Sequence, residues 1–587
     1  MNYHNFYMGE EFEAYQFLGA HVCDKGVVFR AFAPLAKSVS VIGDFNHWTP
    51  QEMEHVYNND FWQIHIENAK PGQMYKFRIE QEDGNVVEHA DPFAFYSQLR
   101  PESASIIRDL NDYKIQDSKW KMNDDRMNIY EVHLGSWKKP SEIEDDWYTY
   151  DELAPLLVPY VKQMGYNCIE IMPLNEYPCD QSWGYQATGF FSPTSRYGTP
   201  KQLCQFVEYC HKHEIAVLLD FVPVHFAVNE YGLKNFDGSD LYSFDHDVKY
   251  NEWGSCNFNH ARREICSFLQ SSAYYWMKEF HFDGLRMDAV GNLIFWQGNA
   301  DRGENKEAIQ FLKTMNAGLK KRKPECVLIA EDSSSWYGVT HSDGLGFDYK
   351  WDLGWMNDTL KYFAMDPYAR CQHYHMLTWS MAYFYNEKFL LPFSHDEVVH
   401  GKKTIVDKMF GTYEEKFAQA RALYMYMYAH PGKKLNFMGN ELGQLREWDE
   451  RRGQDWDILK YPMHGAFYKL IHDLNALYEE HPAMYEWDYK NEGFEWIDCH
   501  LEQQNVYVMK RSCKEESIMA IFNFSGKEQV YNCPSRVGDQ LTLLLDSDGS
   551  WYGGHSDHPV MEMDIRNGYN MVIPAFTARY YQIKKSM

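Results

Sequence analysis

The sequence has few of the features that mark zinc-binding, secreted or membrane proteins. Its 12 cysteines are scattered, with no CxxC pair and no Cys/His cluster at zinc-binding spacing, which argues against a zinc module or a disulfide scaffold. The first residues lack the basic stretch and apolar run of a signal peptide. No apolar run reaches the ~18 residues that a membrane helix needs. We therefore expect a cytoplasmic protein that does not associate with membranes.

Basic residues are also fewer than acidic residues. The chain has 57 Lys and Arg against 84 Asp and Glu, a formal net charge of -27. A field of this sign repels phosphate backbones and anionic lipids, so nucleic acid is not an expected partner and a neutral partner fits better. Solubility alone is a second explanation of the acidity. No low-complexity tract is present and 45% of residues are hydrophobic, as in globular proteins.

At 587 residues, the chain is too long for one ordinary hydrophobic core, so several domains are expected. Residues 1–105 contain short alternating strands separated by turn residues, a pattern typical of an antiparallel β-sandwich. Residues 106–484 alternate apolar strands with helical patterns, which is the rhythm of βα units. Short strands return in residues 485–587 and predict a second β-sandwich.

Eight apolar strands in the middle region are enough to close a barrel. The expected fold class is therefore α/β, with a central (β/α)₈ TIM-type barrel flanked by N-terminal and C-terminal antiparallel β-sandwich domains. One helix between strands is signalled by Thr199 as its cap, Pro200 at its first position and Gln202 completing a capping box. The predicted strands are 127–134, 168–172, 216–221, 284–288, 327–330, 346–349, 389–393 and 435–438.

Four acidic residues stand close to the points where these strands finish, namely Asp220, Asp288, Glu331 and Asp396. Active sites of such barrels lie at the C-terminal ends of the strands, where partial desolvation can shift pKa values. Each residue also has a purely structural explanation. Asp220 could be a turn residue and Asp288 a helix N-cap. Glu331 could be ordinary solvated charge, and Asp396 could pair structurally with His395. Their joint occurrence on one barrel favours a site.

Two carboxyl groups on opposite sides of a bond are what glycoside cleavage requires. One protonates the leaving oxygen, and in the retaining mechanism the other attacks the sugar carbon. A third carboxylate could stabilise the oxocarbenium-like transition state. Arg286, two residues before Asp288, should point to the same side of its strand and keep Asp288 ionised. His225 and His395 could bind sugar hydroxyls. This scheme requires no metal or organic cofactor.

The four segments resemble, in order, the four short motifs of the α-amylase superfamily of retaining glycoside hydrolases and transferases. The resemblance implies that Asp288 is the nucleophile, Glu331 the general acid/base and Asp396 the transition-state stabiliser. Val224 stands where amylases often carry a calcium-ligating Asn, which argues against an amylase-type calcium site. The resemblance also implies a subsite for the cleaved sugar that is lined by Asp220, His225, Arg286 and His395.

Longer strings are similar to those of the 1,4-α-glucan branching enzymes. In one of them, the loop 182–198, Tyr185 would stack on the sugar being cleaved. The resemblance covers about residues 15–587, and its first module looks like the glycan-binding β-sandwich that precedes such barrels. It implies α-1,4-glucan (glycogen, amylose or amylopectin) as the partner, and a transferase that makes α-1,6 branches without a cofactor. The other similar strings are 130–137, 349–359, 395–402 and 437–448.

Two alternative functions stay open on the sequence. The first is a hydrolase on the same barrel, of the debranching or trehalose-releasing type, because the site carboxylates do not separate hydrolysis from transfer. The strings outside the site favour transfer. The second is a non-catalytic glucan-binding protein, which would be expected to have lost Asp288, Glu331 or Asp396. All three are present.

Overall fold

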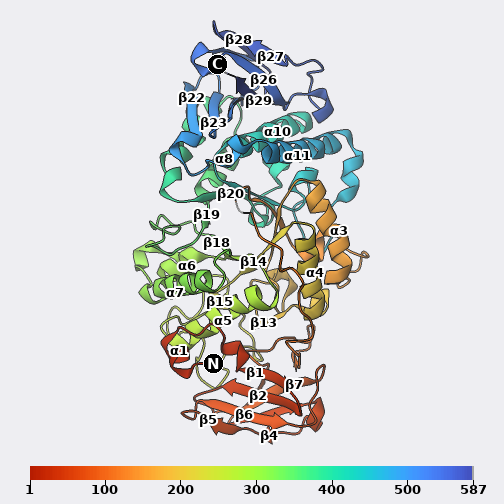
Figure 1. Ribbon diagram of the computed structural model, residues 1–587, viewed down its shortest axis with the longest axis vertical. Coiled ribbons are helices and arrows are strands. Elements are labelled where there is room, and N and C mark those ends of the chain that lie inside the picture. Colours follow the sequence, from red (N-terminus) through yellow and green to blue (C-terminus); the bar gives the residue numbers. More distant parts are fainter. Residues whose placement is uncertain (124, 585–587) are drawn as a thin grey trace. The chain divides into compact units, whose positions relative to one another are not determined.

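The structure is a computed structural model that describes residues 1–123 and 125–584 (Figure 1). Eight strands, β10, β11, β14, β17, β18, β19, β20 and β21, form one closed barrel, which confirms the predicted fold class. The chain divides into two compact units. The first contains Met1–Met122, His133–Val158 and Glu170–Asp348, and the second contains Asn123–Val132, Pro159–Ile169 and Tyr349–Met587. Within the described ranges, no helix is both long enough and apolar enough to cross a membrane.

The first unit begins with two antiparallel sheets that share a core (red in Figure 1). Phe29 of one sheet and Tyr75 of the other meet with ring centroids 5.0 Å apart, so the expected N-terminal β-sandwich is present. The first sheet is ordered β1 (Gly19–Cys23), β2 (Gly26–Phe32), β6 (Phe61–Ile66), β5 (Glu54–Val56). The second is ordered β4 (Gln51–Glu52), β3 (Ser38–Gly43), β7 (Met74–Glu80), β8 (Val86–His89), with β9 (Ser105–Ile106) beside β7.

Three neighbouring parallel strands of the barrel belong to the first unit, and their residues are all buried. They are β14 (Ala216–Phe221), β17 (Gly284–Met287) and β18 (Val327–Ala330). Their register places Asp220 beside Arg286, and Arg286 beside Ile329. Strand β11 spans Cys168–Ile171. The main helices are α3 (Tyr150–Gln163), α4 (Pro200–Lys212), α5 (Arg263–Glu279) and α7 (Lys306–Arg322).

Helix α4 begins as its sequence predicts. The Thr199 hydroxyl accepts a hydrogen bond from the Gln202 N–H at 3.3 Å, and Gln202 Oε1 accepts one from the Thr199 N–H at 2.8 Å. Two backbone donors that a helix start leaves unpaired are thereby satisfied. Phe206 and Val207 lie on the buried face, so local sequence alone was enough to place this helix.

The second unit holds the strands β10 (Asn128–Val132), β19 (Tyr349–Trp351), β20 (Phe389–Phe393) and β21 (Lys433–Phe437). The sixth predicted strand, 346–349, was placed too early, because Gly346 has a left-handed backbone with φ 75° and lies before the strand. The eighth predicted strand, 435–438, begins earlier than predicted, at Lys433.

Lys434 of this strand is a buried lysine. Burial lowers the pKa of Lys434 well below its usual value, and its Nζ donates to two backbone carbonyls at 2.6 Å each.

The C-terminal part of the second unit is also antiparallel, as expected (blue in Figure 1). Helix α10 (Tyr413–Ala429) packs against β29, and the Tyr580 hydroxyl donates to the Met425 carbonyl. The domain boundaries at 105 and 485 stay predictions. The six-stranded sheet is ordered β22 (Phe494–Leu501), β23 (Val506–Ser512), β24 (Ser517–Asn523), β29 (Thr577–Lys584), β26 (Gln540–Asp546), β27 (Glu562–Asp564), and β25 (Gln529–Cys533) pairs with β28 (Tyr569–Ile573). Helices α8 (Leu353–Ala364) and α11 (Pro462–Glu480) belong to the same unit.

A buried charge cluster in the second unit is expected to matter for stability. Asp488 accepts from Arg511 Nη2 at 2.6 Å and from Lys433 Nζ at 3.1 Å. Replacing Asp488 by Ala leaves two buried cations without their anion and should cost about 3–5 kcal/mol. We expect a lower urea midpoint for Asp488→Ala. The control Glu495→Ala, which breaks a surface pair with Lys510, should change stability by less than about 1 kcal/mol.

The same cluster predicts a pH dependence. Burial alone would raise the pKa of Asp488, but the charges of Lys433 and Arg511 outweigh it and hold that pKa below its usual value. A carboxyl with a lowered folded pKa stabilises the fold above its unfolded pKa of about 3.9, and this contribution is lost as pH falls through the folded value. Asp488→Ala should therefore lose less stability than the wild type on acidification below about pH 4. An equal loss in both proteins would contradict this assignment.

Candidate active site

The first unit brings three of the four predicted strand-end carboxylates around one arginine. Asp220 lies in β14, Asp288 follows β17 and Glu331 follows β18. These three strands are neighbours and run parallel, so their carboxyl ends meet at one rim. Asp288 and Glu331 keep side-chain exposures of 15% and 20%, whereas Asp220 is 1% exposed. Two of the three are therefore accessible to a substrate.

Arg286 is the buried cation that these carboxylates share. Its Nη1 lies 2.5 Å from Asp220 Oδ2 and 3.0 Å from Asp288 Oδ1, and its Nη2 lies 3.7 Å from Glu331 Oε2. Burial alone would lower the pKa of Arg286, but the charge of Asp220 and its neighbours raises it well above the usual value. The guanidinium stays charged and stabilises negative charge on Asp288. The sequence predicted this pairing from the spacing of the two residues.

Tyr185 joins the same cluster from the loop 182–198. Its hydroxyl donates to Asp220 Oδ2 at 2.6 Å and lies 3.4 Å from Arg286 Nη1. The other oxygen of Asp220, Oδ1, is buried and has no hydrogen-bond partner among the described residues. A buried acceptor without a partner is costly, and a ligand hydroxyl could satisfy it. The structure thus places Asp220 and Tyr185 beside the arginine, and their roles toward a sugar stay predictions.

His225 is the first residue of β15 (His225–Phe226), which pairs with β16 (Cys256–Asn257). Burial lowers the pKa of His225 to about 4, so the ring is neutral at neutral pH. Its Nδ1 has no hydrogen-bond partner among the described residues, and Trp253 lies with its ring centroid 5.5 Å away. A neutral imidazole with an unpaired nitrogen can donate to or accept from a hydroxyl.

The backbone after Asp288 turns sharply. Ala289 adopts φ 47° and ψ 44°, a left-handed conformation that is uncommon for a residue other than glycine. This turn starts helix α6 (Val290–Ile294) and directs the Ala289 N–H to Glu331 Oε2 at 2.6 Å. Local strain of this kind collects at functional sites. Here it couples the position of Asp288 to that of Glu331.

The second unit holds the remaining predicted residues, His395 and Asp396, in a 3₁₀ turn, η10 (His395–Val398), directly after β20. His395 is buried, while the Asp396 side chain is 54% exposed. His395 Nε2 lies 3.5 Å from Asp396 Oδ1. Both residues therefore stand at a strand end, as predicted. Their catalytic and binding roles stay predictions.

Glu131 of β10 is a residue that sequence reasoning did not single out. Its Oε2 accepts from the His395 N–H at 2.9 Å, and its Oε1 lies 2.5 Å from His395 Nδ1. Both oxygens are thus engaged by one histidine in a fully buried site. This arrangement places a proton on Nδ1, while Nε2 lies on the side of Asp396. The signal in the sequence was an acidic residue in the middle of an apolar strand.

Glu131→Gln should disturb the position of His395 without creating a cavity, because the two side chains have nearly the same volume. A glutamine offers one acceptor oxygen to two N–H donors, so one donor is left unpaired at a cost of about 1–3 kcal/mol. Misplacement of His395 should lower kcat/KM up to about 100-fold. Activity is to be measured well below a melting temperature determined for the variant. An unchanged kcat/KM would show that Glu131 has a structural role only.

Among the residues that the structure describes, one group has the spacing of metal ligands. It consists of His375, His500 and Glu502, whose ligand atoms lie within 4.8 Å of one another. The two histidine side chains are 60% and 79% exposed. None of the predicted site residues belongs to this group. The expectation that the chemistry needs no metal stays a prediction.

Comparison with known proteins extends this description. Residues 17–94 match carbohydrate-binding module 48 (isoamylase N-terminal domain), and residues 157–255 match the alpha amylase catalytic domain. The 1,4-alpha-glucan branching enzyme GlgB of Fusobacterium nucleatum subsp. nucleatum is 45% identical over 571 residues, covering 94% of this chain and 92% of that protein. This chain belongs to the 1,4-α-glucan branching enzyme family.

A second branching enzyme supports this family assignment, and a solved structure supports the fold. GlgB of Halothermothrix orenii is 46% identical over 539 residues, covering 87% of this chain and 85% of that branching enzyme. Among solved structures, the pullulanase from Bacillus acidopullulyticus superposes with a TM-score of 0.73 over 96% of this chain and 74% of that one. At 15% identity, that likeness shows the fold alone. The branching enzyme resemblance found in the sequence is therefore confirmed.

Proposed function

We propose that this chain cleaves α-1,4-glucan through a covalent glycosyl intermediate on Asp288 and transfers the released chain to a glucose 6-hydroxyl, making α-1,6 branches. The observation that carries the proposal is the pair Asp288 and Glu331, held by Arg286 at neighbouring strand ends. Two accessible carboxyl groups on one buried cation provide the groups that a retaining reaction requires. Membership of the branching enzyme family supports transfer as the outcome.

In the first step, an Asp288 oxygen attacks the anomeric carbon while Glu331 gives its proton to the leaving glycosidic oxygen. The bond to the leaving chain breaks and an ester to Asp288 forms. Because Glu331 Oε2 already accepts the Ala289 N–H, the transferred proton belongs on the other oxygen. In the second step, Glu331 takes the proton of an acceptor 6-hydroxyl, whose oxygen attacks the same carbon and releases Asp288. Net retention follows from two displacements.

The surrounding residues have proposed roles as well. Asp396 stabilises the positive charge that develops on the sugar in the transition state. Tyr185 stacks on the sugar being cleaved, and the buried Asp220 acceptor receives one of its hydroxyl donors. The subsite is completed by two histidines that bind hydroxyls and by the central cation, namely His225, His395 and Arg286.

The test is to incubate the purified protein with linear amylose and to follow iodine absorbance together with reducing ends. Transfer predicts that iodine colour falls while reducing ends stay nearly flat, and that a debranching enzyme afterwards releases short chains. A rise of reducing ends in step with the colour loss would identify a hydrolase and would leave the site assignment intact. No change in either quantity would favour a non-catalytic glucan-binding protein.

The partner proposed for this site is neutral α-1,4-glucan, such as glycogen, amylose or amylopectin. The match of residues 17–94 to a carbohydrate-binding module supports this class of ligand. The expectations that nucleic acid is not a partner and that the protein works in the cytoplasm stay predictions.

A further inference from the structure

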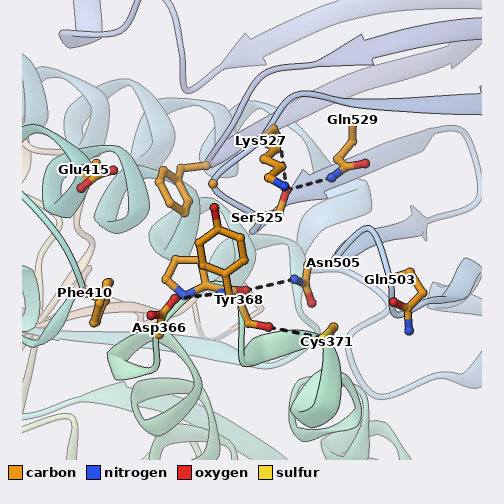
Figure 2. Close-up of a pocket in the computed structure, with 13 residues that line it drawn as sticks. Asp366, Tyr368, Cys371, Phe410, Glu415, Gln503, Asn505, Ser525, Lys527 and Gln529 are labelled. Atoms are coloured by element: carbon orange, nitrogen blue, oxygen red, sulfur yellow. Dashed lines mark hydrogen bonds between the residues drawn. The ribbon is translucent and has the colours of Figure 1, made fainter.

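A cavity of about 330 Å³ lies within the second unit (Figure 2). Its volume falls in the range of small-molecule sites, roughly 300–1,000 Å³. None of the predicted active-site residues lines it. The lining comes from the segment after α8 that contains Tyr368, from Phe410 and Glu415, from the β22–β23 turn with Asn505, and from residues 525–527, Gln529 and Phe576.

Two exposed aromatic side chains line this cavity. Tyr368 is 77% exposed and Phe410 is 44% exposed, and in Figure 2 the Tyr368 ring stands in the middle of the lining residues. Phe576 contributes a third ring that is buried. Large rings at the surface bury apolar area only when a ligand covers them. Such rings match the flat C–H faces of pyranose sugars.

A buried amide beside these rings lacks a partner. Asn505 is 4% exposed, and its Oδ1 makes no hydrogen bond to the described residues. Its Nδ2 reaches the Pro367 carbonyl only at 3.4 Å. If the amide is turned over, the unpartnered atom becomes a nitrogen donor instead. In both orientations a sugar hydroxyl, which can donate and accept, satisfies the group.

The backbone is left-handed where it presents the amide and the buried ring. Asn505 has φ 51° and Phe576 has φ 52°, and for a bulky residue such as Phe576 this left-handed region is an outlier. Neighbouring chain segments hold both positions. The Asn505 carbonyl accepts the Phe524 N–H at 3.0 Å, and the Phe576 N–H donates to the Ser525 carbonyl at 3.1 Å. Strain that the surroundings maintain is common at binding sites.

The charges of the lining favour a neutral ligand. Asp366 and Glu415 bring two carboxylates, and Lys527 is the one cation among the lining residues. The Lys527 ammonium lies 5.4 Å from the centre of the Tyr368 ring. This balance disfavours phosphate or another anion. Carboxylates, amides and rings together fit a ligand with many hydroxyl groups and no charge.

We propose that this cavity is an accessory binding site for a segment of α-1,4-glucan, in addition to the catalytic site. The identity of the ligand rests on the proposed function. The cavity would hold a long chain by a few of its glucose units while another part of the chain reacts. It should therefore affect KM for long substrates and leave kcat unchanged.

Two variants test the cavity, and one variant serves as a matched control. Tyr368→Ala removes an exposed ring. Asn505→Gly removes the amide and keeps a residue that tolerates φ 51°. The control Tyr461→Ala makes the same change at an exposed tyrosine of this unit that does not line the cavity. Melting temperatures establish that all three proteins are folded.

Each protein is compared with the wild type by its retardation in gels that contain amylopectin, and by its KM and kcat on long and short amylose fractions. We expect both cavity variants to migrate faster and to raise KM for the long fraction about 3- to 10-fold, the effect of losing one stacking contact in Tyr368→Ala or one hydrogen bond in Asn505→Gly. Their kcat and their kinetics on the short fraction should match those of Tyr461→Ala.

Retardation and KM that stay at the wild-type values in both cavity variants would overturn the proposal. An equal loss in Tyr461→Ala would also overturn it, because the effect would then be a general property of surface rings. If the wild type makes no branches, the proposed function fails, and the gel retardation of the variants still decides whether the cavity binds glucan.

Discussion

Asp288→Asn is expected to lose branching activity on amylose by about 10,000-fold or more, with little change in melting temperature. The amide cannot form the glycosyl ester, so covalent catalysis is lost. The side-chain oxygen that Arg286 Nη1 contacts at 3.0 Å can be kept by the asparagine, which is why the fold should tolerate the change. Iodine absorbance and the number of new branch points after debranching measure the loss.

Asp288→Ala accompanies this variant because slow deamidation of an asparagine would regenerate the aspartate. If deamidation contributes, the residual activity of Asp288→Asn will grow on storage and that of Asp288→Ala will not. The control is Asp301→Asn, which changes an exposed aspartate of the same unit and should keep full activity. Residual activity above about 1% in Asp288→Ala would show that the nucleophile has been assigned to the wrong residue.

Glu331→Gln should lower kcat on amylose by about 100- to 10,000-fold, the usual contribution of a general acid/base. The glutamine retains an oxygen that can accept the Ala289 N–H, now 2.6 Å from Glu331 Oε2, so the local turn should survive. In a glycosyl fluoride the leaving group is fluoride, which departs without being protonated. The first step on maltosyl fluoride should therefore be much less affected than the first step on amylose.

The same variant should accumulate the covalent intermediate. Deprotonation of the acceptor hydroxyl also depends on Glu331, so the second step is slowed while maltosyl fluoride still reacts with Asp288. Mass spectrometry of the quenched protein should find one added maltosyl group, and peptide mapping should locate it on Asp288. Equal losses on amylose and on maltosyl fluoride, with no adduct, would contradict the role of Glu331 as acid/base.

Local sequence was sufficient for features that depend on nearby residues. The capping box of Thr199 and Gln202 is such a case, because its hydrogen bonds join residues three positions apart. The pairing of Arg286 with Asp288 is another, since alternate residues of a strand point to one side. The order of apolar strands and acidic strand ends was likewise enough to predict the barrel.

Where the prediction failed, a distant contact or a backbone turn was responsible. The sixth strand begins at Tyr349 and not at 346, because Gly346 takes a left-handed turn. Lys433 and Lys434 belong to β21, although the predicted strand began only at 435. Lys433 is paired with buried Asp488, and Lys434 donates to two carbonyls. Neither partner can be identified from a hydrophobic pattern.

The sequence by itself determined the fold class, the family and the carboxylates, because these follow from periodicity and from residue strings read in order. Only the tertiary structure decided which side chains from distant parts of the sequence contact one another. Glu131 orients His395 from a position 264 residues away, and the cavity around Tyr368 collects residues from separate segments. Contacts of this kind depend on how strands register and turns close, and residues distant in sequence carry no local signal of their partner.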